Sequence, residues 1–107
     1  MTEQSLITHR VILRTWPGRS SLVGSRLTRL VEQARTVPAC LTMVTQRHPE
    51  DPRAWQLEMC WDNEQALGAW LAAPLADLFG ELLNQRLVMH IDIQPGAAVA
   101  APLRQAS

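Results

Sequence analysis

Residues Trp55 to Leu71 read WQLEMCWDNEQALGAWL, and this stretch holds a strand followed directly by a helix. From Trp55 to Trp61, large apolar residues occupy every second position, which is the period of a strand with one apolar face. The alternation stops at Asp62, and Gln65 three residues later completes a capping box, which predicts a helix start. The helical spacing is carried by Ala66, Leu67, Trp70 and Leu71. The stretch therefore predicts an α+β domain with tryptophans in both layers.

Three further strands and a second helix are predicted around this stretch. Residues 6–16 precede a Pro-Gly turn, and residues 39–48 and 87–94 also alternate or are rich in β-branched residues. A helix is predicted between the strands of residues 6–16 and 39–48, and either Ser20 or Ser21 can cap its start. Its apolar stripe consists of Val23, Leu27, Leu30, Val31 and Ala34. Pro74 is expected to break the other helical region after Ala73.

The resulting order, βαββαβ, predicts a ferredoxin-like fold with an antiparallel four-stranded sheet in the strand order 4-1-3-2. Pro95-Gly96 is expected to end the last strand, so that residues 1–95 form the domain and residues 96–107 form an Ala-rich tail. This tail is expected to lie across a partner subunit.

A hairpin turning at Glu50 would place opposite residues of its two strands at numbers that sum to about one hundred. Leu41 then faces Met59 on an apolar side, and Cys40 faces Cys60 on a mixed side. Both cysteines are expected to be close but reduced. The mixed side also carries charges of both signs, from Arg10, Arg14, Glu58 and Asp92. Packing this side against a second copy would cover it, which predicts a homodimer.

The composition excludes several classes of function. The 107 residues form one domain, and ten basic and ten acidic side chains give a net charge of zero. No basic cluster is long enough for a nucleic acid or an anionic membrane. Two cysteines without a signal peptide indicate a cytoplasmic protein. No metal-ligand spacing or flavin motif is present, so no cofactor is expected.

The chain resembles the antibiotic biosynthesis monooxygenase family, whose fold is the dimeric α/β barrel. The resemblance covers about Leu6 to Pro95 and rests on the strand that ends in Pro-Gly, on the passage Val37-Pro38-Ala39-Cys40 and on the string WDNEQALGAWLAAPL. It implies a cofactor-independent oxygenase of phenols or hydroquinones, a haem-degrading enzyme or a member without assigned activity. Haem-degrading members need an axial histidine about ten residues after the helix tryptophan, where this chain has Gly80.

Within this resemblance, Trp70 matches the tryptophan of the family's second helix, while the first strand lacks the family's asparagine. Trp70 could stack on a phenolate that transfers an electron to oxygen, or it could be a core anchor. His9 or His90 could act as the base, with a structural hydrogen-bonded role as the alternative for each, and His9 is the one placed in the candidate site. Arg10, Arg14 and Arg86 could hold an anionic intermediate or make salt bridges between subunits. The predicted apolar walls of the substrate cavity are Trp55, Trp61, Met59 and Phe79.

The predicted function is therefore a cofactor-independent monooxygenase that acts on an aromatic or quinol-type small molecule. The alternatives are a non-catalytic homodimeric module that binds a small ligand or a partner protein, and a structural module with a filled core. An open cavity beside Trp70 with a titratable group in its wall would distinguish the enzyme from these alternatives.

Overall fold

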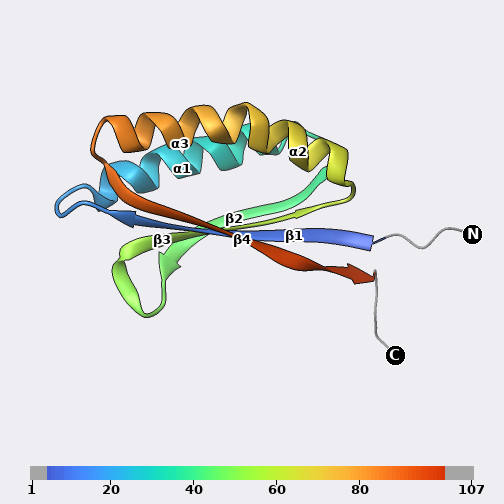
Figure 1. Ribbon diagram of the computed structural model, residues 1–107, viewed down its shortest axis with the longest axis horizontal. Helices are drawn as coiled ribbons and strands as arrows, with labels where there is room; N and C mark the ends of the chain where they lie inside the picture. Colours follow the sequence, from blue (N-terminus) through green and yellow to red (C-terminus); the bar gives the residue numbers. More distant parts are fainter. Residues whose placement is uncertain (1–4, 101–107) are drawn as a thin grey trace, which may run out of the picture.

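The computed structural model describes residues 5–100 of the chain, and the side chains of residues 6–94. Three helices lie on one face of a four-stranded antiparallel sheet, and the other face of the sheet is open (Figure 1). The elements are β1 (Ser5–Thr15), α1 (Ser20–Ala34), β2 (Cys40–His48), β3 (Asp51–Trp61), α2 (Glu64–Ala72), α3 (Pro74–Asn84) and β4 (Val88–Ala100). The predicted ferredoxin-like α+β fold is confirmed, with its second helical region in two pieces.

The sheet has the order β2-β3-β1-β4, as predicted, but the register of the β2–β3 hairpin differs from the prediction. Met43, not Leu41, pairs with Met59, and Thr42, not Cys40, pairs with Cys60. The cause is an irregularity at each end of the hairpin, one between Cys40 and Thr42 and one between Arg47 and His48. Between them the register is shifted by two residues, which leaves each side chain on its predicted face of the sheet.

Strand β4 does not end at Pro95-Gly96, because it continues to Ala100 beside β1. Pro95 pairs with His9 next to a register shift between Ile7 and His9. A proline is tolerated there because β4 is an edge strand, where one side of the backbone needs no ladder hydrogen bond. The predicted boundary at residue 95 is therefore not a strand end. The expected course of the tail beyond residue 100 lies outside the described residues.

The helix starts depend on residues next to the predicted caps. Asn63, not Asp62, caps α2, because its side-chain oxygen accepts a hydrogen bond from the Ala66 backbone N–H at 2.7 Å. Ser20 is already the first residue of α1, and no side-chain cap bond precedes it. Pro74 is the first residue of α3, where its missing N–H removes no helical hydrogen bond, so the predicted break at Ala73 is confirmed.

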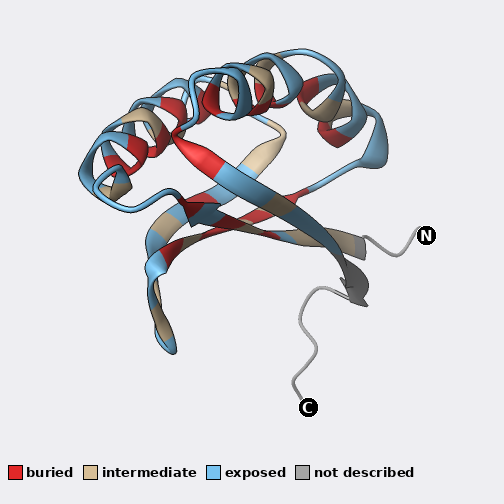
Figure 2. Cartoon of the chain, turned by 60° about the vertical axis from the view of Figure 1, so that its left-hand side comes forward, coloured by how far each residue is buried: buried red, intermediate tan, exposed pale blue. Residues whose placement is uncertain are grey.

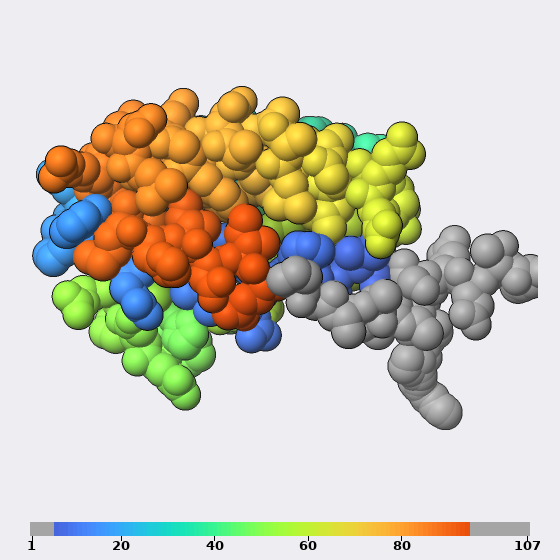
Figure 3. All heavy atoms as spheres, viewed as in Figure 1, coloured from blue at the N-terminus to red at the C-terminus, as the bar shows by residue number. Residues whose placement is uncertain are grey.

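The core fills the layer between the helices and the sheet, where buried residues of both gather (Figure 2). Helix α1 packs on β2 and β3, while α3 packs on β4. From one side, α2 and α3 lie directly on the strands beneath them (Figure 3). Among the described residues, Glu64–Asn84 is a helical stretch long and apolar enough to cross a membrane by length and composition. Leu67, Leu75 and Leu82 of this stretch are buried in the core, and Leu83 is 45% exposed.

Candidate functional site

Two tryptophans meet where β3 passes into α2. Trp61 is the last residue of β3 and is fully buried, and Trp70 on α2 is 9% exposed. Their ring centroids are 5.7 Å apart with the planes tilted by 52°, a favourable aromatic contact. The short connection through the Asn63 cap turns the chain back over the sheet, so the helix tryptophan comes to rest on the strand tryptophan.

His9 lies on the same, helix-covered face of the sheet and next to this pair. It is opposite Met59 in the β1–β3 ladder, and Ile7 is opposite Trp61, so Trp61 is a diagonal neighbour of His9. The Nδ1 atom of His9 and the Nε1 atom of Trp61 are both buried and have no hydrogen-bond partner among the described residues. Buried nitrogens in proteins normally have a hydrogen-bond partner. Within the described part of the chain, the indole N–H of Trp61 is a donor without an acceptor, and Nδ1 of His9 is a second nitrogen without a partner.

The other predicted wall residues divide between this cluster and the surface. Met59 and Phe79 are buried members of the same core as Trp61 and Trp70. Arg86 is exposed in the connection between α3 and β4, with a positive φ of 58°. The charge of Arg86 is therefore at the surface of the molecule. The Trp61–Trp70 pair, His9, Met59 and Phe79 together form the tryptophan cluster.

Trp55 was also expected to line this cavity, and the structure places it elsewhere. It lies six residues before Trp61 on the same strand, roughly 20 Å away at the rise of a β-strand. Its indole N–H donates to the backbone oxygen and the Oγ of Ser20, both at 3.0 Å, at the start of α1. The guanidinium of Arg47 covers its ring at 5.1 Å. Trp55 therefore fastens α1 to the sheet and does not belong to the tryptophan cluster.

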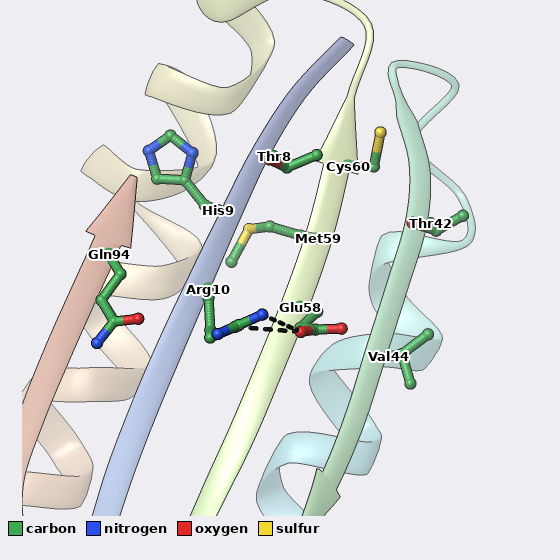
Figure 4. Close-up of a pocket in the computed structure, with 9 residues that line it drawn as sticks. All are labelled: Thr8, His9, Arg10, Thr42, Val44, Glu58, Met59, Cys60 and Gln94. Carbon is green, nitrogen blue, oxygen red and sulfur yellow. Dashed lines mark hydrogen bonds and ion pairs between the residues drawn. The ribbon is translucent and has the colours of Figure 1, made fainter. Parts of the chain in front are cut away.

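A pocket of about 470 Å³ lies on the open face of the sheet. In Figure 4 its lining residues project from β1, β2, β3 and β4, and they are Thr8, His9, Arg10, Thr42, Val44, Glu58, Met59, Cys60 and Gln94. His9 and Met59 belong to this lining and to the tryptophan cluster as well. Three further pockets of the described residues are lined by α1, β2, β3 and α3 and do not include Trp70.

Two arginines of the open face are paired with carboxylates of the same chain. Arg10 donates from Nε and Nη2 to Glu58 Oε2, each at 3.1 Å, and Gln56 donates to the same oxygen at 2.8 Å. Arg14 lies 3.5 Å from Asp51. Exposed ion pairs of this kind contribute little to stability. They neutralise Arg10 and Arg14, while Asp92 on β4 accepts a hydrogen bond from the Gln94 side chain at 2.9 Å. Val44 is an exposed apolar residue of the same face.

Both cysteines are free thiols at the end of the sheet near Trp61. Burial raises the pKa of the Cys60 thiol, and burial together with the neighbouring Cys60 raises the pKa of Cys40. The Cys40 thiol donates to the Thr42 carbonyl at 3.5 Å. Thiols held in the neutral form are poor nucleophiles, so neither is a good candidate for covalent catalysis.

The tryptophan cluster could be foreseen only in part from the sequence. Alternation placed Trp61 on the helix-covered face and spacing placed Trp70 toward the sheet, but no pattern shows that a nitrogen lacks a partner. Within residues 6–94, no group of three histidine, cysteine or acidic side chains is arranged to hold a metal ion. The chemistry that this arrangement offers is a half-buried base, His9, whose Nδ1 atom is buried beside an aromatic wall and an indole donor.

The fold is shared with several solved structures. A protein of unknown function from Nitrosomonas europaea has a TM-score of 0.78 and 14% identity, with 99% of this chain and 100% of that chain covered. A candidate antibiotic biosynthesis monooxygenase from Deinococcus radiodurans has a TM-score of 0.77 and 20% identity over 94% and 99% of the two chains. A conserved protein of unknown function from Bacteroides thetaiotaomicron has a TM-score of 0.73 and 17% identity over 87% and 97%.

At these identities the likeness establishes the fold alone. No curated protein matches the chain. The sequence model of one family, antibiotic biosynthesis monooxygenase, matches residues 7–82, which run from β1 to the last turn of α3 and include the whole tryptophan cluster. The protein therefore belongs to the antibiotic biosynthesis monooxygenase family.

Proposed function

We propose that this protein is a cofactor-independent monooxygenase that acts on a phenolic or quinol-type small molecule. The observation that carries the proposal is the unpartnered Nδ1 atom of His9 beside the Trp61–Trp70 pair. A histidine nitrogen that is buried and has no partner is suited to take a proton from a bound substrate hydroxyl. The two indoles supply flat apolar surface on which an aromatic ring can stack.

The proposed reaction takes all its electrons from the substrate. His9 removes the phenolic proton of an anthrone-type substrate in its enol form, which leaves an electron-rich anion. This anion transfers one electron to dioxygen, and the resulting radical and superoxide combine to form a peroxide at carbon. The peroxide takes a proton back from His9 and loses water. In the sum, a CH₂ group and O₂ give a C=O group and H₂O.

The contribution of the protein is to exclude water and to orient the ring. In a buried apolar site, the anion has no hydration shell to stabilise it, so its electron is transferred more easily. Holding the ring against Trp70 fixes the carbon that combines with oxygen. Trp70 keeps 9% exposure and Phe79 keeps 8%, so the cluster still reaches solvent at its helical side.

The proposal includes a homodimer formed through the open face of the sheet. Arg10 and Arg14 of that face are paired within the chain, and Val44 is 52% exposed there. A face with its arginines paired, an exposed apolar side chain and a pocket of about 470 Å³ is suited to a second copy. We also place the protein in the reducing cytoplasm, which the free Cys40 and Cys60 support.

The rival function is a non-catalytic homodimeric module that binds a small ligand or only provides structure. One observation favours it: Trp61 and Trp70 pack against each other as core residues do, and the four described pockets lie elsewhere. The two functions differ in whether oxygen is consumed, so this quantity separates them.

Oxygen uptake with a panel of anthrones and hydroquinones tests the proposal. The variants are Trp70→Ala and His9→Ala, and the matched controls are Trp16→Ala, which changes an exposed tryptophan, and His90→Ala, which changes an exposed histidine. We expect uptake to fall by about 10²-fold in His9→Ala, the size of a general-base effect. The controls are expected to keep the wild-type rate. Equal, background-level uptake in all five proteins would leave only the binding or structural module.

A further inference from the structure

The two unpartnered nitrogens of the tryptophan cluster differ in what they can bind. The indole Nε1–H of Trp61 can only donate a hydrogen bond, whereas Nδ1 of a neutral imidazole accepts when the proton is on Nε2. Thr45 Oγ1 is a third buried atom without a partner in the described part of the chain. Thr45 lies on β2, and β3 separates it from His9 on β1, so Thr45 is not part of this pair.

The ladder brings the donor and the acceptor to one place. His9 and Trp61 are diagonal neighbours on the helix-covered face of β1 and β3. Diagonal side chains in a sheet are within reach of one ligand atom when one of them is aromatic. Trp61 is fully buried, so its N–H has no water to bind unless a molecule enters the core.

We propose that Trp61 and His9 together bind one hydroxyl oxygen of the ligand, and that Trp61 is a specificity-determining residue. The indole N–H donates to this oxygen, and the hydroxyl proton is donated to Nδ1 of His9. The inference rests on the proposed function and names the group that the site recognises, a neutral phenolic hydroxyl. When the proton moves from oxygen to Nδ1, the bond from Trp61 becomes charge-assisted and stabilises the phenolate.

This pair of residues should distinguish a phenol from a methyl ether and from a carboxylate. A methyl ether keeps the acceptor oxygen but has no proton for His9, so it leaves one buried nitrogen unpaired. A carboxylate carries its charge into the core, while Arg86, Arg10 and Arg14 are exposed and Arg10 and Arg14 are paired elsewhere. The site is therefore expected to prefer phenols over ethers and over aromatic acids of the same size.

Binding without oxygen tests the inference separately from catalysis. The full chain is titrated anaerobically by calorimetry with hydroquinone and with hydroquinone dimethyl ether. The wild type is expected to bind hydroquinone about tenfold more tightly, the discrimination typical of one unpaired buried polar group. Trp61→Phe keeps a ring but removes the N–H, and its preference is expected to fall several-fold. Trp16→Phe, which removes the N–H of an exposed tryptophan outside the tryptophan cluster, should keep the preference.

Unfolding in urea tests whether Trp61 has a purely structural role. Removing an unsatisfied buried N–H costs no hydrogen bond, so Trp61→Phe is expected to unfold at a urea concentration close to that of Trp70→Phe. The inference is overturned if the wild type binds neither probe, if Trp61→Phe keeps the full preference, or if a crystal structure shows only a water molecule bridging the two nitrogens. A preference for hydroquinone without oxygen uptake would refute the proposed monooxygenase and leave the inference standing.

Discussion

Gly24 shows how one residue fixes the position of a helix on the sheet. A Cβ atom at Gly24 would lie 2.5 Å from Cζ2 and 2.8 Å from Cη2 of Trp55. That ring cannot easily move, because its N–H is bonded to Ser20 and its face is covered by Arg47. The absence of a side chain in the middle of α1 is therefore required for this contact, although glycine is a poor helix former.

Gly24→Ala is predicted to destabilise the protein by about 1–3 kcal/mol, because the overlap with Trp55 exceeds the gain in helix propensity. The matched control is Gly68→Ala in α2, where a Cβ would meet nothing within 4 Å. This change is predicted to stabilise the protein by about 0.5–1 kcal/mol. Urea denaturation measures both free energies of unfolding. Equal signs for the two variants would refute the account of Gly24.

The two cysteine thiols make the stability of the folded chain depend on pH. Burial raises the pKa of both thiols in the folded chain, so the folded state holds their protons more tightly than the unfolded state does. Their contribution to stability is complete below the unfolded value of about 8.5 and is lost as the pH rises above it. Iodoacetamide at pH 8.5 is predicted to modify both thiols more slowly in native protein than in urea. Equal rates would show that the thiols are not shielded.

At the scale of the elements, the cap of α2 depends on one side chain. Asn63 Oδ1 accepts from the Ala66 N–H, whereas Asp62 accepts only from the Asn63 side chain. Asn63→Ala is predicted to cost about 1 kcal/mol of stability, and Asp62→Ala is predicted to cost less. Urea denaturation of the two variants checks this order. A larger loss of stability in Asp62→Ala than in Asn63→Ala would contradict the Asn63 cap and support the capping box that the sequence predicts.

The elements were predictable because their periods are strong, while their pairing depended on local irregularities. Alternation from Trp55 to Trp61 defined β3, and Pro74 marked the break between α2 and α3. The hairpin register was missed because two irregularities shift it by two residues, and no residue type marks them. Pro95 predicts a strand end from the sequence alone, since its tolerance on β4 depends on the edge position, which is a property of the whole sheet.

The same distinction applies to the site. Trp70 and Trp61 were found because large apolar residues at regular spacing must face the core. Trp55 has the same spacing as Trp61, and only the packing of α1 over the sheet shows that it serves another contact. Whether His9 has a partner depends on side chains from several elements, so the sequence could name it as a candidate but could not show its unpaired nitrogen.

For the whole molecule, the open face of the sheet is predicted to hold a second copy of the chain. Val44→Arg would place a charge at the exposed apolar position of that face and is predicted to convert the dimer to a monomer. Leu22→Arg is the matched control, since Leu22 is 46% exposed on α1 and Val44 is 52% exposed on β2. Light scattering on a size-exclusion column measures the mass. A wild-type monomer at micromolar concentration would contradict the prediction.

Oxygen transfer from dioxygen to the substrate defines a monooxygenase, and labelled oxygen follows it directly. The purified chain is incubated with an anthrone under ¹⁸O₂, and the product is analysed by mass spectrometry against His9→Ala and a buffer control. We predict that the wild type forms a quinone carrying one ¹⁸O atom at the former CH₂ carbon, with the second ¹⁸O in water. Product at the buffer level, or product without the label, would contradict the proposed reaction.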